Sequence, residues 1–223
     1  MFILAIAIFS TSPFYNANFF LPIRSLSVFS NPAGLGISTG AEAFATYDLG
    51  SEVITTGASA GNIGFGYMKD DSLHFYEISI GYRLPGAFTI GYAYEFGDTS
   101  VHIAGIECRP NGQLSLSCRT EIKHQRYVSG GIEIMPYLHY VTLSFAVTYE
   151  GIDDTLAFLY GGMITPIHGL GAFFFADKEF NWNAGMEFSF GYGKITGKYS
   201  SQSEKFSGGL LLSAQRYRTF VED

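Results

Sequence analysis

The feature that most constrains this chain is a period of two in hydrophobicity, repeated over segments of about ten residues. In the clearest segment, FNWNAGMEFSFGY at residues 180–192, large apolar side chains alternate with polar or very small ones. Successive side chains of a β-strand point to opposite faces, so this alternation predicts a strand with one apolar face and one polar face. Residues 72–83, 87–96 and 139–149 follow the same rule.

Residues that favour tight turns separate these segments. Examples are Gly61-Asn62, Asn111-Gly112 and Asp177-Lys178. Their spacing predicts about twelve strands in consecutive up-and-down order. An antiparallel meander of this size has two unpaired edges unless it closes on itself. We therefore expect an all-β fold, an antiparallel up-and-down β-barrel with no amphipathic helix of its own.

Composition indicates which face of the barrel points outward. The chain has 21 Phe and 15 Tyr, and its charged residues amount to only 15%. Twelve strands with such apolar faces would overfill an interior, because barrels of more than about eight strands already leave a lumen. We expect a transmembrane barrel whose aromatic residues face lipid and whose small and polar residues face the lumen. The alternative is a soluble lipid-binding barrel, in which Trp182 and Phe188 would point inward.

The N-terminus reads as an export signal. Residues 1–9, MFILAIAIF, form an apolar run that is shorter than the roughly 20 residues of a transmembrane helix. The run is typical of the hydrophobic region of a signal peptide, which we expect to cover residues 1–17; a buried first strand is the alternative. Residues 18–36 then form an N-terminal segment and residues 37–219 the barrel. The expected localisation is the bacterial outer membrane.

A short motif lies just before the first expected strand. Asn31, Pro32, Ala33, Gly34 and Leu35 resemble the NPAGL motif of the FadL/PorV superfamily of outer-membrane barrels. The resemblance implies that residues 18–36 pack into the barrel as a hatch. The compact chain also resembles the barrel domains fused ahead of signal-peptide-peptidase-A-type serine proteases, and its ending SAQRYRTFVED leaves room for a following domain.

Charged residues on the less apolar strand faces are the candidates for lining the lumen. A mixture of both signs inside a narrow barrel either guides a ligand along a polar path or fills and rigidifies the barrel, and the sequence favours the second reading. Lys194, Thr196 and Lys198 alternate in the same way and join this lining or an exposed extension. The seven main candidates are Glu77, Arg83, Glu95, Arg119, Glu121, Glu133 and Glu187.

Several chemistries find no support in the sequence. The five histidines are scattered without metal-ligand spacing, so we expect no metal, and no motif predicts another cofactor. Ser100, His102 and Glu107 are close in sequence, but their spacing does not establish a catalytic triad, and we expect no enzymatic activity. The formal charge of -7 argues against a nucleic-acid partner. Cys108 and Cys118 could form one disulfide, which the sequence leaves open.

We therefore expect an outer-membrane β-barrel that binds or conducts a small hydrophobic ligand. Its expected partners are membrane lipid, that ligand and a periplasmic or secretion partner. The alternative is a scaffold or anchoring barrel that transports nothing. A filled lumen would favour the scaffold, whereas a continuous apolar pocket that reaches the hatch would favour transport.

Overall fold

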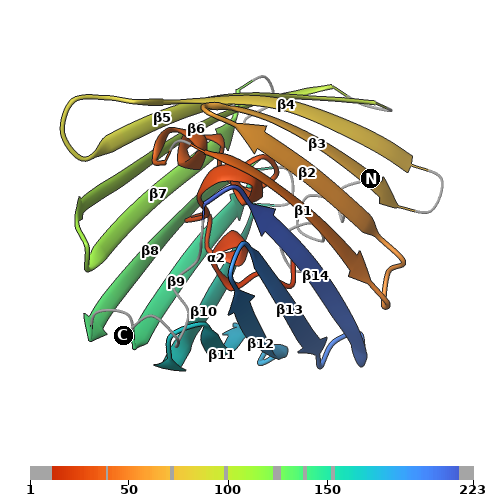
Figure 1. Ribbon diagram of the computed structural model, residues 1–223. Helices are drawn as coiled ribbons and strands as arrows, with labels where there is room; N and C mark the ends of the chain where they lie inside the picture. Colours follow the sequence, from red (N-terminus) through yellow and green to blue (C-terminus); the bar gives the residue numbers. More distant parts are fainter. Residues whose placement is uncertain are drawn as a thin grey trace.

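The chain folds into a closed antiparallel barrel of fourteen strands around a short N-terminal segment (Figure 1). The computed structural model describes residues 12–38, 40–70, 73–97, 100–122, 127–137, 140–151 and 154–215. No helix in these ranges is long and apolar enough to cross a membrane.

Each strand pairs with its neighbours in sequence, and β1 pairs with β14 to close the barrel. The strands are β1 (Ala41–Asp48), β2 (Ile54–Ala60), β3 (Ile63–Asp70), β4 (Leu73–Arg83), β5 (Phe88–Gly97), β6 (Val101–Asn111), β7 (Leu114–Glu121), β8 (Tyr127–Tyr137), β9 (Val141–Glu150), β10 (Thr155–Ile167), β11 (Leu170–Asp177), β12 (Trp182–Phe190), β13 (Gly193–Ser200) and β14 (Lys205–Ser213).

The two ends of the barrel are distinguished by the chain termini. Glu42, near the start of β1, is opposite Ser213, the last residue of β14. We call this the terminus end and the opposite one the far end. Connections are short: residues 61–62 join β2 to β3 at the terminus end, and residues 201–204 join β13 to β14 at the far end.

The closed antiparallel barrel confirms the predicted fold class, but the predicted count of about twelve strands was too low. The prediction assumed that successive strands begin about 12 to 16 residues apart, whereas β2 and β3 begin only nine residues apart, at Ile54 and Ile63. A two-residue turn at Gly61-Asn62 makes this possible. The β2 sequence ITTGASA also lacks a run of large apolar residues, so hydrophobic alternation gives it little signal.

The large apolar side chains of the strands point mostly outward. Trp182 is 39% exposed and Phe188 is 38% exposed, and the same face of β4 exposes Tyr76, Ile78 and Ile80. An exterior of this kind is stable only against hydrocarbon, so the barrel is a transmembrane one. The alternative soluble barrel with Trp182 and Phe188 inside is excluded.

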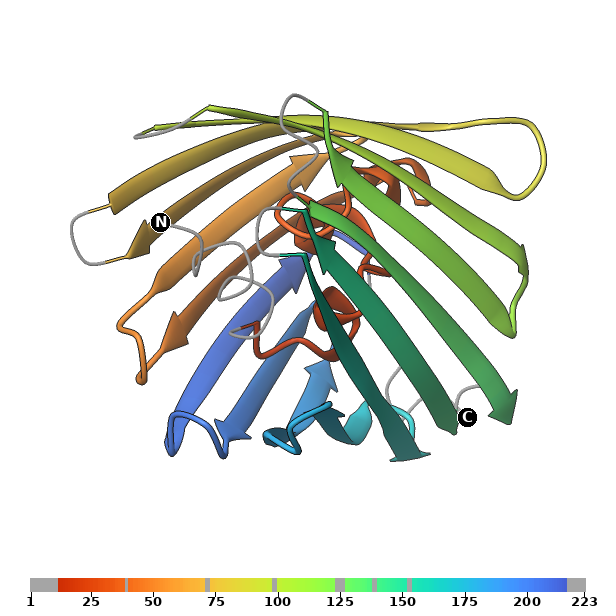
Figure 2. The same cartoon turned by 180° about the vertical axis from the view of Figure 1, so that it is seen from behind.

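The N-terminal segment occupies the lumen, as the views from both sides show (Figures 1 and 2). We call its described part, residues 12–38, the plug. It contains α2 (Tyr15–Asn18) and the 3-10 turns η1 (Arg24–Ser27) and η2 (Pro32–Gly36). The η1 turn contacts β1, β2 and β3, and η2 contacts β4, β5 and β6.

The hydrophobic core lies between the plug and the inner wall. One cluster packs Phe14, Val28 and Phe29 of the plug against Phe44 and Phe75 of the wall. A second cluster includes buried side chains on both sides: Tyr15, Phe19, Phe20, Leu21, Ala146, Phe173 and Phe175. The inward aromatic residues of the strands thus have a specific role, because they pack against the plug.

Candidate functional site

The plug and the wall around it form the candidate functional site, and the Asn31–Leu35 motif holds the plug to that wall. The side chain of Asn31 accepts a hydrogen bond from the Ala33 amide at 3.2 Å and so caps η2. Its amide group donates to the carbonyl oxygens of Phe20, in the plug, at 3.2 Å and Ile106, in β6, at 3.4 Å. Asn31, Pro32, Ala33, Gly34 and Leu35 are all buried.

Glycines in three neighbouring strands make room for the motif. Gly81 is directly opposite Gly91, and Gly91 is directly opposite Gly105. We call these three residues the glycine track. A Cβ atom at Gly91 would come within 2.2 Å of the Pro32 carbonyl carbon, and one at Gly105 would meet the Asn31 side chain. Any larger residue would therefore displace the plug, because only glycine, which has no side chain, lets the backbone of the plug approach the backbone of the wall this closely.

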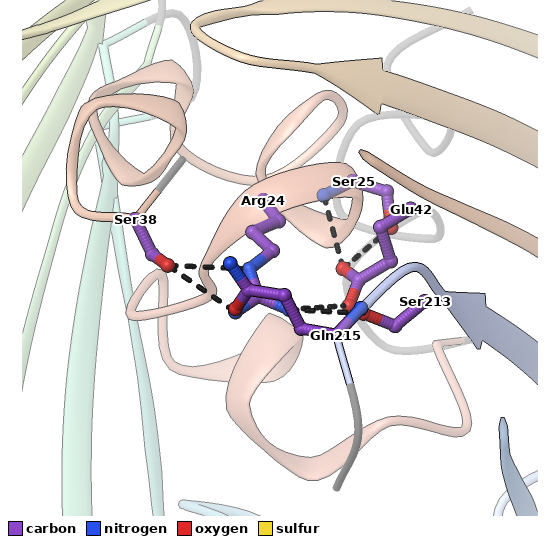
Figure 3. Close-up of polar contacts among 6 residues, drawn as sticks. All are labelled: Arg24, Ser25, Ser38, Glu42, Ser213 and Gln215. Atoms are coloured by element: carbon purple, nitrogen blue, oxygen red, sulfur yellow. Dashed lines mark hydrogen bonds and ion pairs between the residues drawn. The ribbon is translucent and has the colours of Figure 1, made fainter. Parts of the chain in front are cut away.

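A second anchor ties the plug to the seam between β1 and β14 (Figure 3). The Arg24 guanidinium pairs with Glu42 of β1 at 3.4 Å and donates to the Ser213 hydroxyl of β14 at 3.1 Å. It also donates to Ser38 and Gln215. The second Glu42 oxygen accepts from the Ser25 hydroxyl at 2.9 Å. One plug residue thus bridges both strands of the closure.

Tyr15 makes the third anchor. Its hydroxyl donates to Ser144 of β9 at 3.0 Å, and its backbone N–H donates to Glu187 of β12 at 3.0 Å. Burial raises the pKa of the Tyr15 phenol, so the group stays protonated as a donor. Tyr15 lies within the predicted signal peptide, whose cleavage remains a prediction. A chain beginning at residue 18 would lack these contacts.

The predicted lumen residues fall into groups at different depths. Glu77 and Glu95 are directly opposite each other on β4 and β5, and Arg119 of β7 interacts electrostatically with both of them and with Glu121. Arg119 also donates to the Phe29 carbonyl of the plug at 3.1 Å. This group combines three carboxylates with one guanidinium.

Arg83, Glu133, Glu187 and Lys194 lie toward the terminus end, whereas Lys198 lies toward the far end. Glu187 pairs with Lys194 at 2.7 Å, whereas the buried Glu133 has no ion-pair partner within 4.0 Å among the described residues. Arg83, the last residue of β4, is exposed at the terminus end. Thr196 is buried and donates to the Pro13 carbonyl, and Lys198 is buried with its ammonium group 5.7 Å from the Phe175 ring centre.

Two ion pairs were missed from the sequence, Glu107–Arg109 and Arg24–Glu42. Glu107 accepts from Arg109 at 2.7 Å, and Arg109 donates in turn to the Leu21 carbonyl of the plug. Glu107 and Arg109 are two and four residues after Gly105 on β6, so all three point into the lumen. The alternation of that strand could therefore have identified both as lumen-lining residues. Arg24 gave no such signal, because the plug has no periodic pattern.

Two cavities lie on either side of α2. The far-end cavity has a volume of about 220 Å³ and is bounded by Asn18 and Phe20 of the plug and by wall residues including Leu159 and Phe175. The terminus-end cavity has a volume of about 280 Å³ and is bounded by Asn16 of the plug. Residues of α2 therefore contribute to the boundary of both cavities.

The two cysteines are free thiols. Cys108 is opposite Leu116 and Cys118 is opposite Ile106, so the cysteines are diagonal neighbours on the outer face of β6 and β7. Diagonal positions are about 7–8 Å apart, too far for a disulfide without movement of the backbone. Within the described ranges, no group of three or more His, Cys, Asp or Glu residues could hold a metal ion.

Comparison with known proteins yields a likeness in fold alone. No family model and no curated protein matches the sequence. Among solved structures, the Acinetobacter baumannii outer membrane protein Omp33 is similar with a TM-score of 0.56 and 11% identity, over 82% of this chain and 99% of that chain. A mutant of the Rh. blastica porin gives a TM-score of 0.50 and 9% identity, over 78% of this chain and 98% of that chain. By its fold and its apolar exterior, this chain is an outer-membrane β-barrel, as predicted.

Proposed function

We propose that this protein is a plugged barrel of the bacterial outer membrane that binds a small, partly hydrophobic ligand in its far-end cavity. The observation that carries the proposal is that this cavity reaches the plug, whose Asn18 and Phe20 form part of its boundary. A ligand bound there would contact the wall and the plug at once. Because the plug occupies the lumen, the barrel can bind this ligand as it stands, but it can conduct the ligand across the membrane only if the plug moves.

The lining of the cavity favours a ligand with one apolar and one polar side. Leu159 and Phe175 offer apolar contact, and the side-chain oxygens of Asn18 and Asn183 are buried with no hydrogen-bond partner among the described residues. A buried acceptor without a partner is costly, so an N–H donor on the ligand would be favoured. An aromatic amide meets both requirements.

Resemblance to the FadL/PorV superfamily supports the same proposal. The Asn31–Leu35 motif lies in the lumen, where a hatch would be expected, and the cavity next to the plug suits a hydrophobic ligand. The large aromatic residues outside make membrane lipid the expected environment.

Benzamide is a suitable probe, with binding measured by saturation-transfer NMR on the refolded protein in detergent. We expect Leu159→Trp to abolish binding by filling the cavity. Leu116→Trp is the matched control, because Leu116 is on the outer face and exposed. Equal binding by both variants, or no saturable binding by the unaltered protein, would contradict the proposal.

The second candidate is a scaffold or anchoring barrel that binds a periplasmic or secretion partner. The filled lumen favours it, because hydrogen bonds hold the plug to the wall at several places, among them Tyr15, Arg24 and Asn31. If benzamide does not bind and the barrel conducts no ions across a membrane, the scaffold or anchoring role is favoured.

We also propose that the protein is not an enzyme. His102 points outward and contacts Tyr92 through a hydrogen bond at 2.5 Å, whereas Glu107 points inward and pairs with Arg109. These two residues are on opposite faces of β6 and cannot act on one substrate atom together. A refolded sample that leaves nitrophenyl esters of short and long acyl chains unhydrolysed would agree with this proposal, and turnover above the buffer rate would contradict it.

A further inference from the structure

The terminus-end cavity contains a buried carboxylate with few hydrogen-bond donors around it. Glu133 of β8 is 1% exposed, and among the described residues its carboxylate interacts with the Ser144 hydroxyl, directly opposite on β9, and has no ion-pair partner within 4.0 Å. Glu133 bounds the cavity together with Met135, Met163 and Thr165. One hydroxyl does not satisfy both oxygens of a buried carboxylate, so the cavity favours a molecule that supplies further donors.

The other charges near Glu133 are already engaged. The Glu187 carboxylate accepts from Lys194 at 2.7 Å and from the Tyr15 amide at 3.0 Å. Arg109 interacts electrostatically with Glu133, but its guanidinium donates to Glu107 and to the Leu21 carbonyl. The Glu187–Lys194 pair is neutral as a unit, and His168 also bounds the cavity, so within the described residues Glu133 is the acidic side chain of this cavity that has no cation within 4.0 Å.

We propose that the terminus-end cavity binds a small organic cation, specifically a primary alkylammonium group on a short aliphatic chain. The ammonium group donates up to three hydrogen bonds, which suits the Glu133 carboxylate, because its two oxygens can accept more hydrogen bonds than the Ser144 hydroxyl supplies. The aliphatic chain lies against the thioether side chains of Met135 and Met163, which adapt to ligands of different shape. A divalent metal ion is a poorer candidate, because the described residues provide no cluster of three metal-ligating side chains.

Methionine methyl groups provide a direct test with n-butylammonium chloride as the probe. Met135 and Met163 bound the cavity, whereas Met68 is buried elsewhere in the lumen and Met186 is on the outer face. In a titration of the full chain labelled with [13C]methyl-methionine, we expect saturable shifts of the Met135 and Met163 methyl signals alone. Equal concentrations of n-butanol and sodium butyrate should cause no saturable shift.

The role of Glu133 is tested by Glu133→Gln, which keeps the shape and removes the charge. We expect its affinity for n-butylammonium to fall by about tenfold or more. Glu121→Gln is the matched control, because Glu121 bounds the far-end cavity instead, and it should leave the affinity unchanged.

Three results would overturn the proposal: no saturable shift in the unaltered chain, the same shift with n-butanol, or unchanged affinity in Glu133→Gln. If Glu133→Gln does not fold, the comparison of n-butylammonium with n-butanol in the unaltered chain decides. Benzamide binding at the far-end cavity is measured separately, so the proposal for either cavity can be contradicted without affecting the proposal for the other.

Discussion

At the scale of single residues, the glycine track determines how closely the plug lies against the wall. We expect Gly91→Val to lower the free energy of unfolding by about 3 kcal/mol, because the new side chain overlaps the Pro32 backbone. Urea unfolding in lipid vesicles measures this change. Gly197→Val is the matched control, because a Cβ atom at Gly197 meets nothing within 4 Å. Equal stability of the two variants would show that the track does not hold the plug.

The burial of Tyr15 predicts how the stability of the protein depends on pH. Its phenol has a raised pKa in the folded protein, whereas an unfolded chain ionises it near pH 10. The contribution of the protonated Tyr15 phenol to the free energy of unfolding is therefore complete below about pH 10 and is lost as the pH rises above that value. Tyr15→Phe should show a smaller loss of stability between about pH 10 and pH 11 than the unaltered protein. If the stability of Tyr15→Phe and that of the unaltered protein fall equally between these pH values, this account is contradicted.

At the scale of elements, the Arg24 anchor connects the plug to the strands that close the barrel. The side chains of Arg24 and Glu42 are 11% and 3% exposed, so removal of one leaves the other charge buried. We expect Arg24→Met to destabilise the protein by about 3 kcal/mol. The double variant Arg24→Met/Glu42→Met should recover most of this loss, and a strictly additive double variant would rule out the pairing.

Strands and plug differ in how far the sequence predicts them. The alternation at residues 180–192 placed Trp182 and Phe188 on the same face of a strand, and the composition of the chain predicted that this face points outward. The plug has no such rule. Its position depends on contacts between residues far apart in the chain, such as Tyr15 with Ser144, and on a row of glycines whose alignment depends on register.

At the scale of the whole molecule, the predicted barrel and the direction of its faces were confirmed, and the strand count was not. Closure follows from the cost of unpaired edges and does not depend on an accurate number of strands. The two cavities could not be predicted, because their boundaries combine plug residues such as Asn16 and Asn18 with strands that are distant in sequence.

The central claim is that this transmembrane barrel is closed by its own N-terminal segment, and ion conductance across a planar lipid bilayer tests it most directly. With insertion verified by heat-modifiable migration of the recovered protein, the unaltered chain should show no steady conductance, and Gly91→Val, which displaces the plug, should show openings. A steady ohmic conductance of the unaltered chain, equal to that of Gly91→Val, would contradict the claim.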